Sequence, residues 1–117
     1  MMHEARWQIE REVMNQHFPS FAAVNTNRTL GFYGYLRGPR TGRLYLVSVL
    51  SPAARYPELE PPVYIEPRVG PHWNPDGVNH DPRGRLDYVR DKPWNPRINT
   101  FANCVLCAIA YLKEYDQ

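Results

Sequence analysis

Proline is distributed very unevenly along this chain, and its positions restrict where regular structure can form. Of the 12 prolines in 117 residues, ten lie between Pro52 and Pro96. Proline lacks an amide hydrogen and disrupts helix interiors and central strands, so this stretch must consist largely of turns and loops. The longer helices and strands are therefore expected mainly outside it.

One such segment is residues 4–17, which contain no glycine or proline. Trp7, Val13 and Met14 lie among charged side chains there, which is typical of a surface helix that ends before Pro19.

A second helix is predicted over residues 100–115, with Asn99 or Thr100 as its cap. Its apolar side chains recur at helical spacing, so it is expected to pack on a sheet with these residues buried. They are Phe101, Val105, Ile109 and Leu112.

Three runs rich in β-branched and aromatic residues lie at 29–36, 43–50 and 63–66. Residues 37–42 between the first two have clear turn chemistry, so the runs predict an antiparallel meander. Residues 67–96 form a long loop with one apolar interruption at 86–89, and a loop of this length in a small domain is usually functional. The order of the elements predicts a single α+β domain over residues 1–117, with its sheet covered on one face.

The charge balance and the targeting signals give little information about the partners and the location of the protein. Fourteen Lys and Arg residues face 12 Asp and Glu residues, and the net charge of +2 does not imply a nucleic-acid or membrane partner. No signal peptide or apolar run long enough to cross a bilayer is visible, so a cytoplasmic location is expected. The two cysteines, Cys104 and Cys107, fall in the second predicted helix, which gives no support to a secreted disulfide framework.

Catalysis on small molecules has no support, because glycine-rich phosphate loops and the H-E-x-x-H and G-x-S-x-G motifs are missing. Cys104 and Cys107 have C-x-x-C spacing and, with His72 and His80, form a candidate zinc site or relocated nucleophile. Their apolar neighbours favour simple packing, so no metal or cofactor is expected.

The aromatic run 32–36 lies among several arginines and is similar to the strand of an RNA-recognition sheet. The aromatic motif of such sheets is incomplete, and aromatic residues are ordinary strand formers. We therefore expect no nucleic-acid partner, although an RNA-binding domain stays open as an alternative.

Taken together, four short motifs resemble the ubiquitin-conjugating-enzyme family and the related RWD domains. Residues 56–62 resemble the Tyr-Pro…Pro-Pro turn, Gly38-Pro39 the end of the first strand, and Trp94-Asn95-Pro96 the Trp-x-Pro before a helix. The catalytic segment of the enzymes matches in spacing at Asn79, Gly84, Leu86 and Asp87. The resemblance covers about residues 4–115 and implies an antiparallel meander flanked by two helices. The chain is also similar in length to small bacterial members of the family.

The resemblance places the active site at Asp87, Asn79 and His80, but the chain departs from the pattern there. Asp87 stands where the enzymes have the nucleophilic cysteine, and Gly77-Val78 replaces the His-Pro before Asn79. Asn79 is then either an oxyanion-stabilising amide or a loop residue that bonds nearby backbone, and the missing cysteine favours the second role. Asp87 and His80 are likewise either a general base or polar loop residues.

These departures predict a non-catalytic interaction module of a ubiquitin-like protein conjugation pathway. Its expected partners are the ubiquitin-like protein, the activating enzyme or a catalytic conjugating partner, with no membrane partner. The alternative is an atypical conjugating enzyme that uses a non-standard nucleophile.

Overall fold

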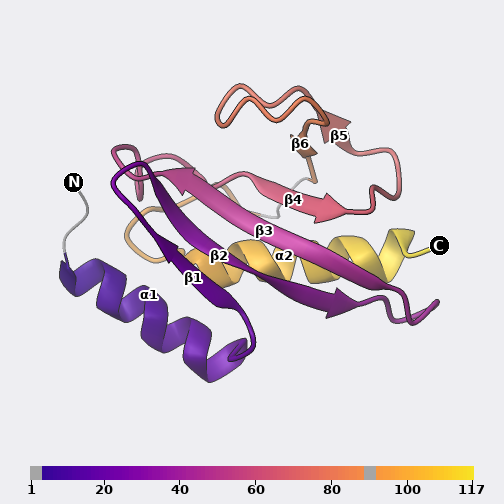
Figure 1. The fold of residues 1–117 in the computed structure, drawn as a ribbon, viewed down its shortest axis with the longest axis horizontal. Helices are drawn as coiled ribbons and strands as arrows, with labels where there is room; N and C mark the ends of the chain where they lie inside the picture. The colour runs from indigo at the N-terminus through magenta and orange to yellow at the C-terminus, as the bar shows by residue number, and fades with distance from the viewer. Residues whose placement is uncertain (1–3, 89–91) are drawn as a thin grey trace.

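A computed structural model of the chain describes residues 4–88 and 92–117. These residues form two helices and six strands (Figure 1). The helices are α1 (Glu4–His17) and α2 (Phe101–Tyr115). The strands are β1 (Ala22–Asn25), β2 (Thr29–Arg37), β3 (Leu44–Pro52), β4 (Val63–Glu66), β5 (Trp73–Asn74) and β6 (Arg85–Leu86).

The main sheet is an antiparallel meander in the order β1-β2-β3-β4, and β5 and β6 form a second, two-stranded sheet. The three predicted strands correspond to β2, β3 and β4, and the predicted α+β class is confirmed. Two features were not predicted: the β5–β6 pair and the short edge strand β1. Four residues of β1 pair with β2, from Ala22 opposite Tyr33 to Asn25 opposite Leu30.

Both helices contact the same face of the sheet, which is called the inner face below. In Figure 1, α2 runs behind β2, β3 and β4. From α1, the ring of Trp7 stacks on Phe32 of β2 at 5.3 Å, and Phe32 in turn meets Phe101 of α2 edge-on at 5.6 Å. The opposite side of the sheet is the outer face.

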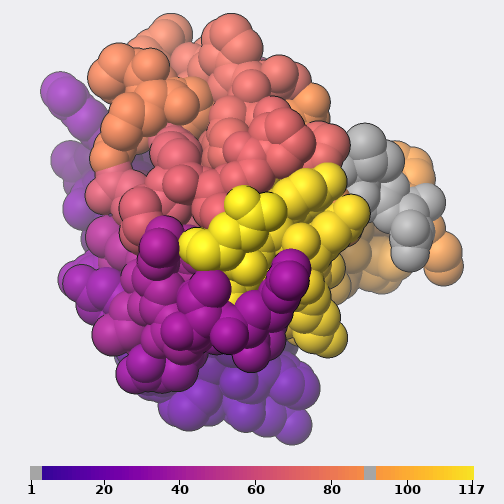
Figure 2. Space-filling view, turned by 90° about the vertical axis from the view of Figure 1, so that its right-hand side faces the viewer, coloured from indigo at the N-terminus to yellow at the C-terminus, as the bar shows by residue number. Residues whose placement is uncertain are grey.

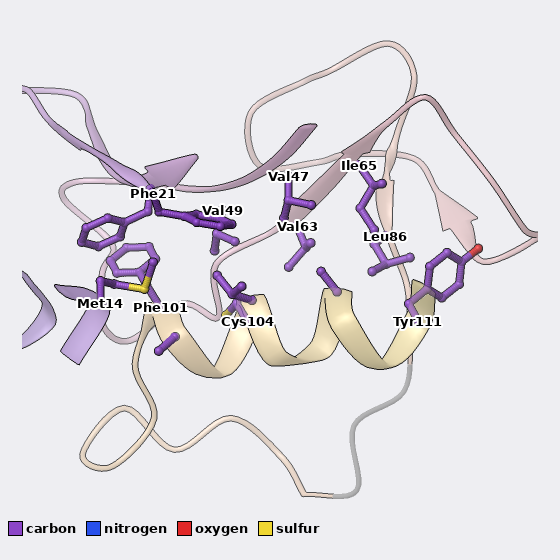
Figure 3. Close-up of a cluster of buried hydrophobic side chains, with 14 of the residues drawn as sticks. Met14, Phe21, Val47, Val49, Val63, Ile65, Leu86, Phe101, Cys104 and Tyr111 are labelled. Carbon is purple, nitrogen blue, oxygen red and sulfur yellow. The ribbon is translucent and has the colours of Figure 1, made fainter. Parts of the chain in front are cut away.

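Side chains of β3 alternate between the two faces, as expected for a strand with one buried side. Tyr45, Val47 and Val49 are fully buried, whereas the residues between them are only half-buried. Figure 3 shows the valines of β3 and β4 pointing at α2, with Phe21 and Met14 closing the end nearest α1.

The predicted buried face of α2 is confirmed except at one position. Phe101, Val105 and Leu112 are at most 2% exposed, but Ile109 is only half-buried. The helix turns a neighbouring row toward the sheet instead: Cys104, Ala108 and Tyr111. None of the helices in the described ranges is long and apolar enough to cross a lipid bilayer.

Helix α1 has its predicted ends, but it is more than a surface helix because Glu10 is fully buried. The Glu10 carboxylate accepts hydrogen bonds from Arg6 Nε (2.8 Å), from the Tyr56 hydroxyl and from the backbone N–H of Phe101 (2.9 Å). It thereby satisfies an amide at the start of α2, which otherwise lacks a partner within the helix. Arg6 also donates to the carbonyl oxygens of Pro96 and Asn99, so α1 is tied to the segment that leads into α2.

The other end of α2 is tied to the turn between β2 and β3. Asp116 accepts hydrogen bonds from the backbone N–H groups of Arg40 and Thr41 and from the hydroxyls of Thr41 and Tyr45. Burial by itself raises the pKa of the Asp116 carboxyl, but the hydrogen bonds from Thr41 and Tyr45 outweigh it and hold that pKa well below its usual range. Figure 2 shows this end of α2, in yellow, lying against the turn, in purple.

Candidate functional site

Asp87 directly follows β6 and lies on an exposed edge of the β5–β6 pair. Its backbone N–H donates to the carbonyl oxygen of His72 (2.8 Å), and its carboxylate accepts a hydrogen bond from Asn74 Nδ2 (2.5 Å). The approach of the two strands requires Gly84, which has a φ of +85° and lies where a Cβ would be 2.5 Å from the Asn74 carbonyl oxygen. Gly84, the glycine of the predicted catalytic segment, is therefore required by the close approach of the two strands.

Asn79 lies in the loop between β5 and β6, beside the outer face of the sheet. Its Nδ2 donates to the Leu50 carbonyl oxygen (3.0 Å) and to the Tyr64 hydroxyl (2.9 Å). Both amide hydrogens are thus used to hold the loop on β3 and β4. Of the two roles weighed for Asn79, this arrangement matches a loop residue that bonds backbone, although its partners lie on strands and not in its own turn.

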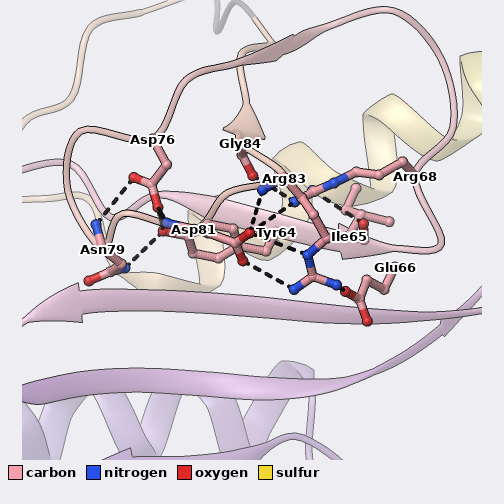
Figure 4. A network of polar contacts seen from close by, with 9 residues as sticks. All are labelled: Tyr64, Ile65, Glu66, Arg68, Asp76, Asn79, Asp81, Arg83 and Gly84. Atoms are coloured by element: carbon pink, nitrogen blue, oxygen red, sulfur yellow. Dashed lines mark hydrogen bonds and ion pairs between the residues drawn. The ribbon is translucent and has the colours of Figure 1, made fainter.

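Asp76 organises the same loop from inside. Its carboxylate accepts hydrogen bonds from the Tyr64 hydroxyl (2.6 Å) and from the backbone N–H groups of Val78, Asn79 and Asp81 (Figure 4). Burial raises the pKa of the Asp76 carboxyl, but the hydrogen bonds from Tyr64 and the backbone outweigh it, so the pKa lies below its ordinary value of 3.8. Burial and the adjacent carboxylate raise the pKa of Tyr64 well above its usual range, so its hydroxyl stays a donor.

The lowered pKa of Asp76 predicts a pH-dependent contribution to stability. Above the ordinary carboxyl pKa of 3.8 the contribution is fully present, and it is lost as the pH falls toward the lower pKa of the folded state. We expect the urea midpoint of Asp76→Asn to lie below that of the native chain near neutral pH and the gap to narrow between pH about 5 and about 2.5. A gap that stays constant over this range would show that ionisation of Asp76 does not hold the loop.

His80 is exposed and adopts a left-handed backbone conformation, with a φ of +57°. It borders a hollow on the outer face. Among the described residues, no hydrogen bond or ion pair joins Asp87 to Asn79 or His80. Asn79 and Asp87 are therefore held by different partners, and neither is joined to the other.

The two cysteines have different surroundings. Cys104 is buried, as predicted, but Cys107 is half-buried and lies 3.9 Å from the Tyr88 carbonyl oxygen. It lines a hollow of about 880 Å³ between α2 and residues 92–99. Val89, at the end of the predicted apolar interruption, lies outside the described residues. Within residues 4–88 and 92–117, no group of three His, Cys, Asp or Glu side chains is arranged to hold a metal ion.

A polar network borders the outer face next to the loop (Figure 4). Arg83 pairs with Glu66 and with Asp81, and Arg68 donates to the Gly84 carbonyl oxygen (2.6 Å) while its guanidinium stacks 4.1 Å from the Trp73 ring centroid. Desolvation is the largest influence on Arg68 and lowers its pKa. The two arginines, Arg68 and Arg83, and the two carboxylates, Glu66 and Asp81, neutralise each other. These four side chains form a wall along the edge of the sheet.

The outer face itself carries a surface that extends beyond the predicted site residues Asn79 and His80, which border one of its hollows. Tyr33, Tyr35 and Leu44 are 45%, 63% and 49% exposed. Beside them lie two adjoining hollows of about 800 and 550 Å³, which share Leu46, Glu66 and Arg83. The period-two pattern of residues 33–37 is the sequence signal for this surface, because alternate residues of a strand face the same side.

Comparison of the chain with protein-family models, with curated proteins and with solved structures found no match.

Proposed function

We propose that this chain is a non-catalytic interaction module of the ubiquitin-conjugating-enzyme-like type, acting in a pathway that conjugates a ubiquitin-like protein. The observation that carries the proposal is that an aspartate, Asp87, stands where the resemblance places the nucleophilic cysteine. Its carboxylate is exposed and accepts a hydrogen bond from Asn74. A carboxylate cannot form a thioester, and the acyl anhydride it would form is much more reactive toward water, so Asp87 is unsuited to carry an acyl group.

The environment of Asn79 supports the same proposal. In the enzymes that the chain resembles, an amide at this position stabilises the oxyanion of the transfer step. Here both hydrogens of the amide are bonded to Leu50 and Tyr64. An oxyanion would have to replace one of these bonds, which removes the benefit of a donor already aimed at the developing charge.

A binding role needs exposed apolar side chains, and two lie near the segment that follows Asp87. Ile98 is 73% exposed and Leu106 is 52% exposed, and both border the hollow that Cys107 lines. Exposed apolar residues grouped around a concave surface are typical of protein-binding sites. We propose this side of α2 as the contact surface for the ubiquitin-like protein, the activating enzyme or a catalytic conjugating partner, with no cofactor.

The proposal predicts the result of a transfer assay. We expect no covalent adduct when the chain is incubated with ATP and the activating enzyme and ubiquitin-like protein of the same genome, followed by gels with and without reductant. We expect the same for Asp87→Asn, which keeps the size of the side chain and its contact with Asn74. Binding of the ubiquitin-like protein or of a conjugating partner, measured by calorimetry, is expected to weaken about tenfold in Leu106→Asp, as for an anchor residue of an interface.

The same assay tests the alternative of an atypical enzyme, which the half-buried Cys107 favours. A reducible adduct on the native chain that disappears in Cys107→Ala would overturn the non-catalytic proposal. An adduct that resists reductant and is lost in Asp87→Asn would show that the carboxylate carries the acyl group. Asp87→Cys provides a positive control for the position, because a thioester on this variant would show that the loop still presents residue 87 to the activated protein.

A further inference from the structure

We propose that the outer face of the sheet binds an extended peptide that carries apolar side chains at alternating positions and acidic residues at one end. The floor of this site is the outward row of β3, which consists of Leu44, Leu46, Ser48 and Leu50. The site lies on the side of the sheet away from both helices, so it is distinct from the surface proposed above on α2.

The shape of the outer face fits an extended chain. From Leu44 to Leu50 the row is about 20 Å long, since a strand rises about 3.3 Å per residue. Tyr33 and Tyr35 of β2 stand along one side, and the wall that contains Arg83 stands along the other. The two adjoining hollows meet at Leu46, so a peptide lying over them would place an apolar side chain in each.

Spacing favours an extended peptide over a helical one. Outward residues of β3 repeat about every 7 Å, which is also the repeat of same-side residues in an extended peptide. Neighbouring side chains on one face of a helix repeat at about 5–6 Å and fall out of step with this row.

The positive charge at one end of the outer face indicates that the peptide is acidic at the matching end. Arg37 is exposed, lies on the same face as Tyr35 and is directly opposite Leu44 in the register of β2 and β3. The outward positions of β2 and β3 hold no acidic residue, so the end of the site near the turn is positively charged and complementary to carboxylates.

The same surface is a poor fit for single-stranded RNA. Phosphates need free cations along the length of the strand. Arg83 is neutralised by Glu66 and Asp81, and Glu66 also lines both hollows. Tyr33 and Tyr35 offer exposed rings beside the row, but the floor itself consists of leucine and serine, which give apolar contacts and no ring for a base to stack on. A peptide is therefore the occupant that the observations favour.

The test uses the full chain and a fluorescein-labelled peptide in which a run of glutamates is followed by leucines at alternating positions. We expect saturable binding by fluorescence anisotropy, with the affinity reduced about tenfold by Arg37→Glu and by Leu44→Asp, as for single anchor contacts of an interface. Arg11→Glu and Ile9→Asp are the matched controls on α1. Ile9 is 51% exposed, against 49% for Leu44, and neither control is expected to change the affinity.

The proposal is overturned if the native chain does not bind the peptide, or if the control variants weaken binding as much as the two test variants. It is also overturned if a labelled single-stranded RNA binds more tightly than the peptide and loses affinity steeply with salt. Sedimentation that shows a dimer dissolved by Leu44→Asp would replace the peptide with a second copy of the chain. Because the test variants leave Asp87 and α2 unchanged, failure here leaves the transfer assay and the binding measured with it unaffected.

Discussion

Glu10→Ala is expected to lower the free energy of unfolding by about 3–5 kcal/mol, the usual cost of removing one partner from a buried, hydrogen-bonded ion pair. The substitution leaves three donors without their acceptor: Arg6 Nε, the Tyr56 hydroxyl and the backbone N–H of Phe101. Arg6 keeps its bonds to carbonyl oxygens, but its charge loses the carboxylate that neutralises it. Urea unfolding followed by circular dichroism measures the change.

The matched control is Glu12→Ala, two residues along the same helix. Glu12 is exposed and accepts a hydrogen bond from Gln8 at 3.3 Å, so its removal is expected to change stability by less than about 0.5 kcal/mol. A double-mutant cycle with Arg6→Ala isolates the energy of the pair. Equal effects of the two glutamate substitutions would contradict the assignment of Glu10 as the link between the helices.

Phe101→Ala is expected to cost about 3–5 kcal/mol, as for other buried aromatic residues replaced by alanine. The Phe101 ring is fully buried, stacks on Tyr56 at 4.2 Å and meets Trp7 and Phe32 edge-on. Its loss leaves a cavity where α1, α2 and the sheet meet, and Figure 3 shows its position at the start of α2. Thermal and urea unfolding measure the cost.

Leu106→Ala is the control for this substitution, because Leu106 is on the same helix but 52% exposed. Its expected cost is below about 1 kcal/mol, since little apolar surface is buried there. Phe101→Leu should fall between the two, because leucine fills part of the cavity. A Phe101→Ala protein as stable as Leu106→Ala would mean that the core does not depend on this ring.

Much of the fold was predictable because local signals determine it. The first helix has its predicted ends, since residues 4–17 contain neither glycine nor proline. The meander follows from strand-forming runs around a Gly-Pro turn. The strand β1 was missed because its residues, Ala22 to Asn25, have little preference for a strand and gain their partners only from β2.

The burial of Glu10 was not predictable from its position in a charged helix. A carboxylate enters a core only where donors converge on it, and here the donors come from residues far along the chain. Ile109 illustrates the same limit, because helical spacing identifies an apolar stripe but the rotation of α2 on the sheet decides which of its edges is covered.

The contacts of the candidate site residues could not be predicted from the sequence. Spacing and resemblance picked out Asn79, Gly84 and Asp87, and the structure gives each a defined set of contacts or a defined conformation. The partners that determine those contacts are Leu50 and Tyr64 for Asn79 and Asn74 for Asp87, and no local pattern names them. The role of Asp87 in a conjugation pathway stays a prediction until the transfer assay is done.

The contacts from Arg6 and Glu10 to residues 96–101 also have a consequence for the order of folding. A 14-residue helix such as α1 is marginally stable alone in water, and here three of its polar anchors lie 90 to 93 positions away in the chain. Closing so long a loop costs entropy before the contacts can repay it. The element that comes first in sequence is therefore among the last to be fixed, and it should open together with the start of α2 as one cooperative unit.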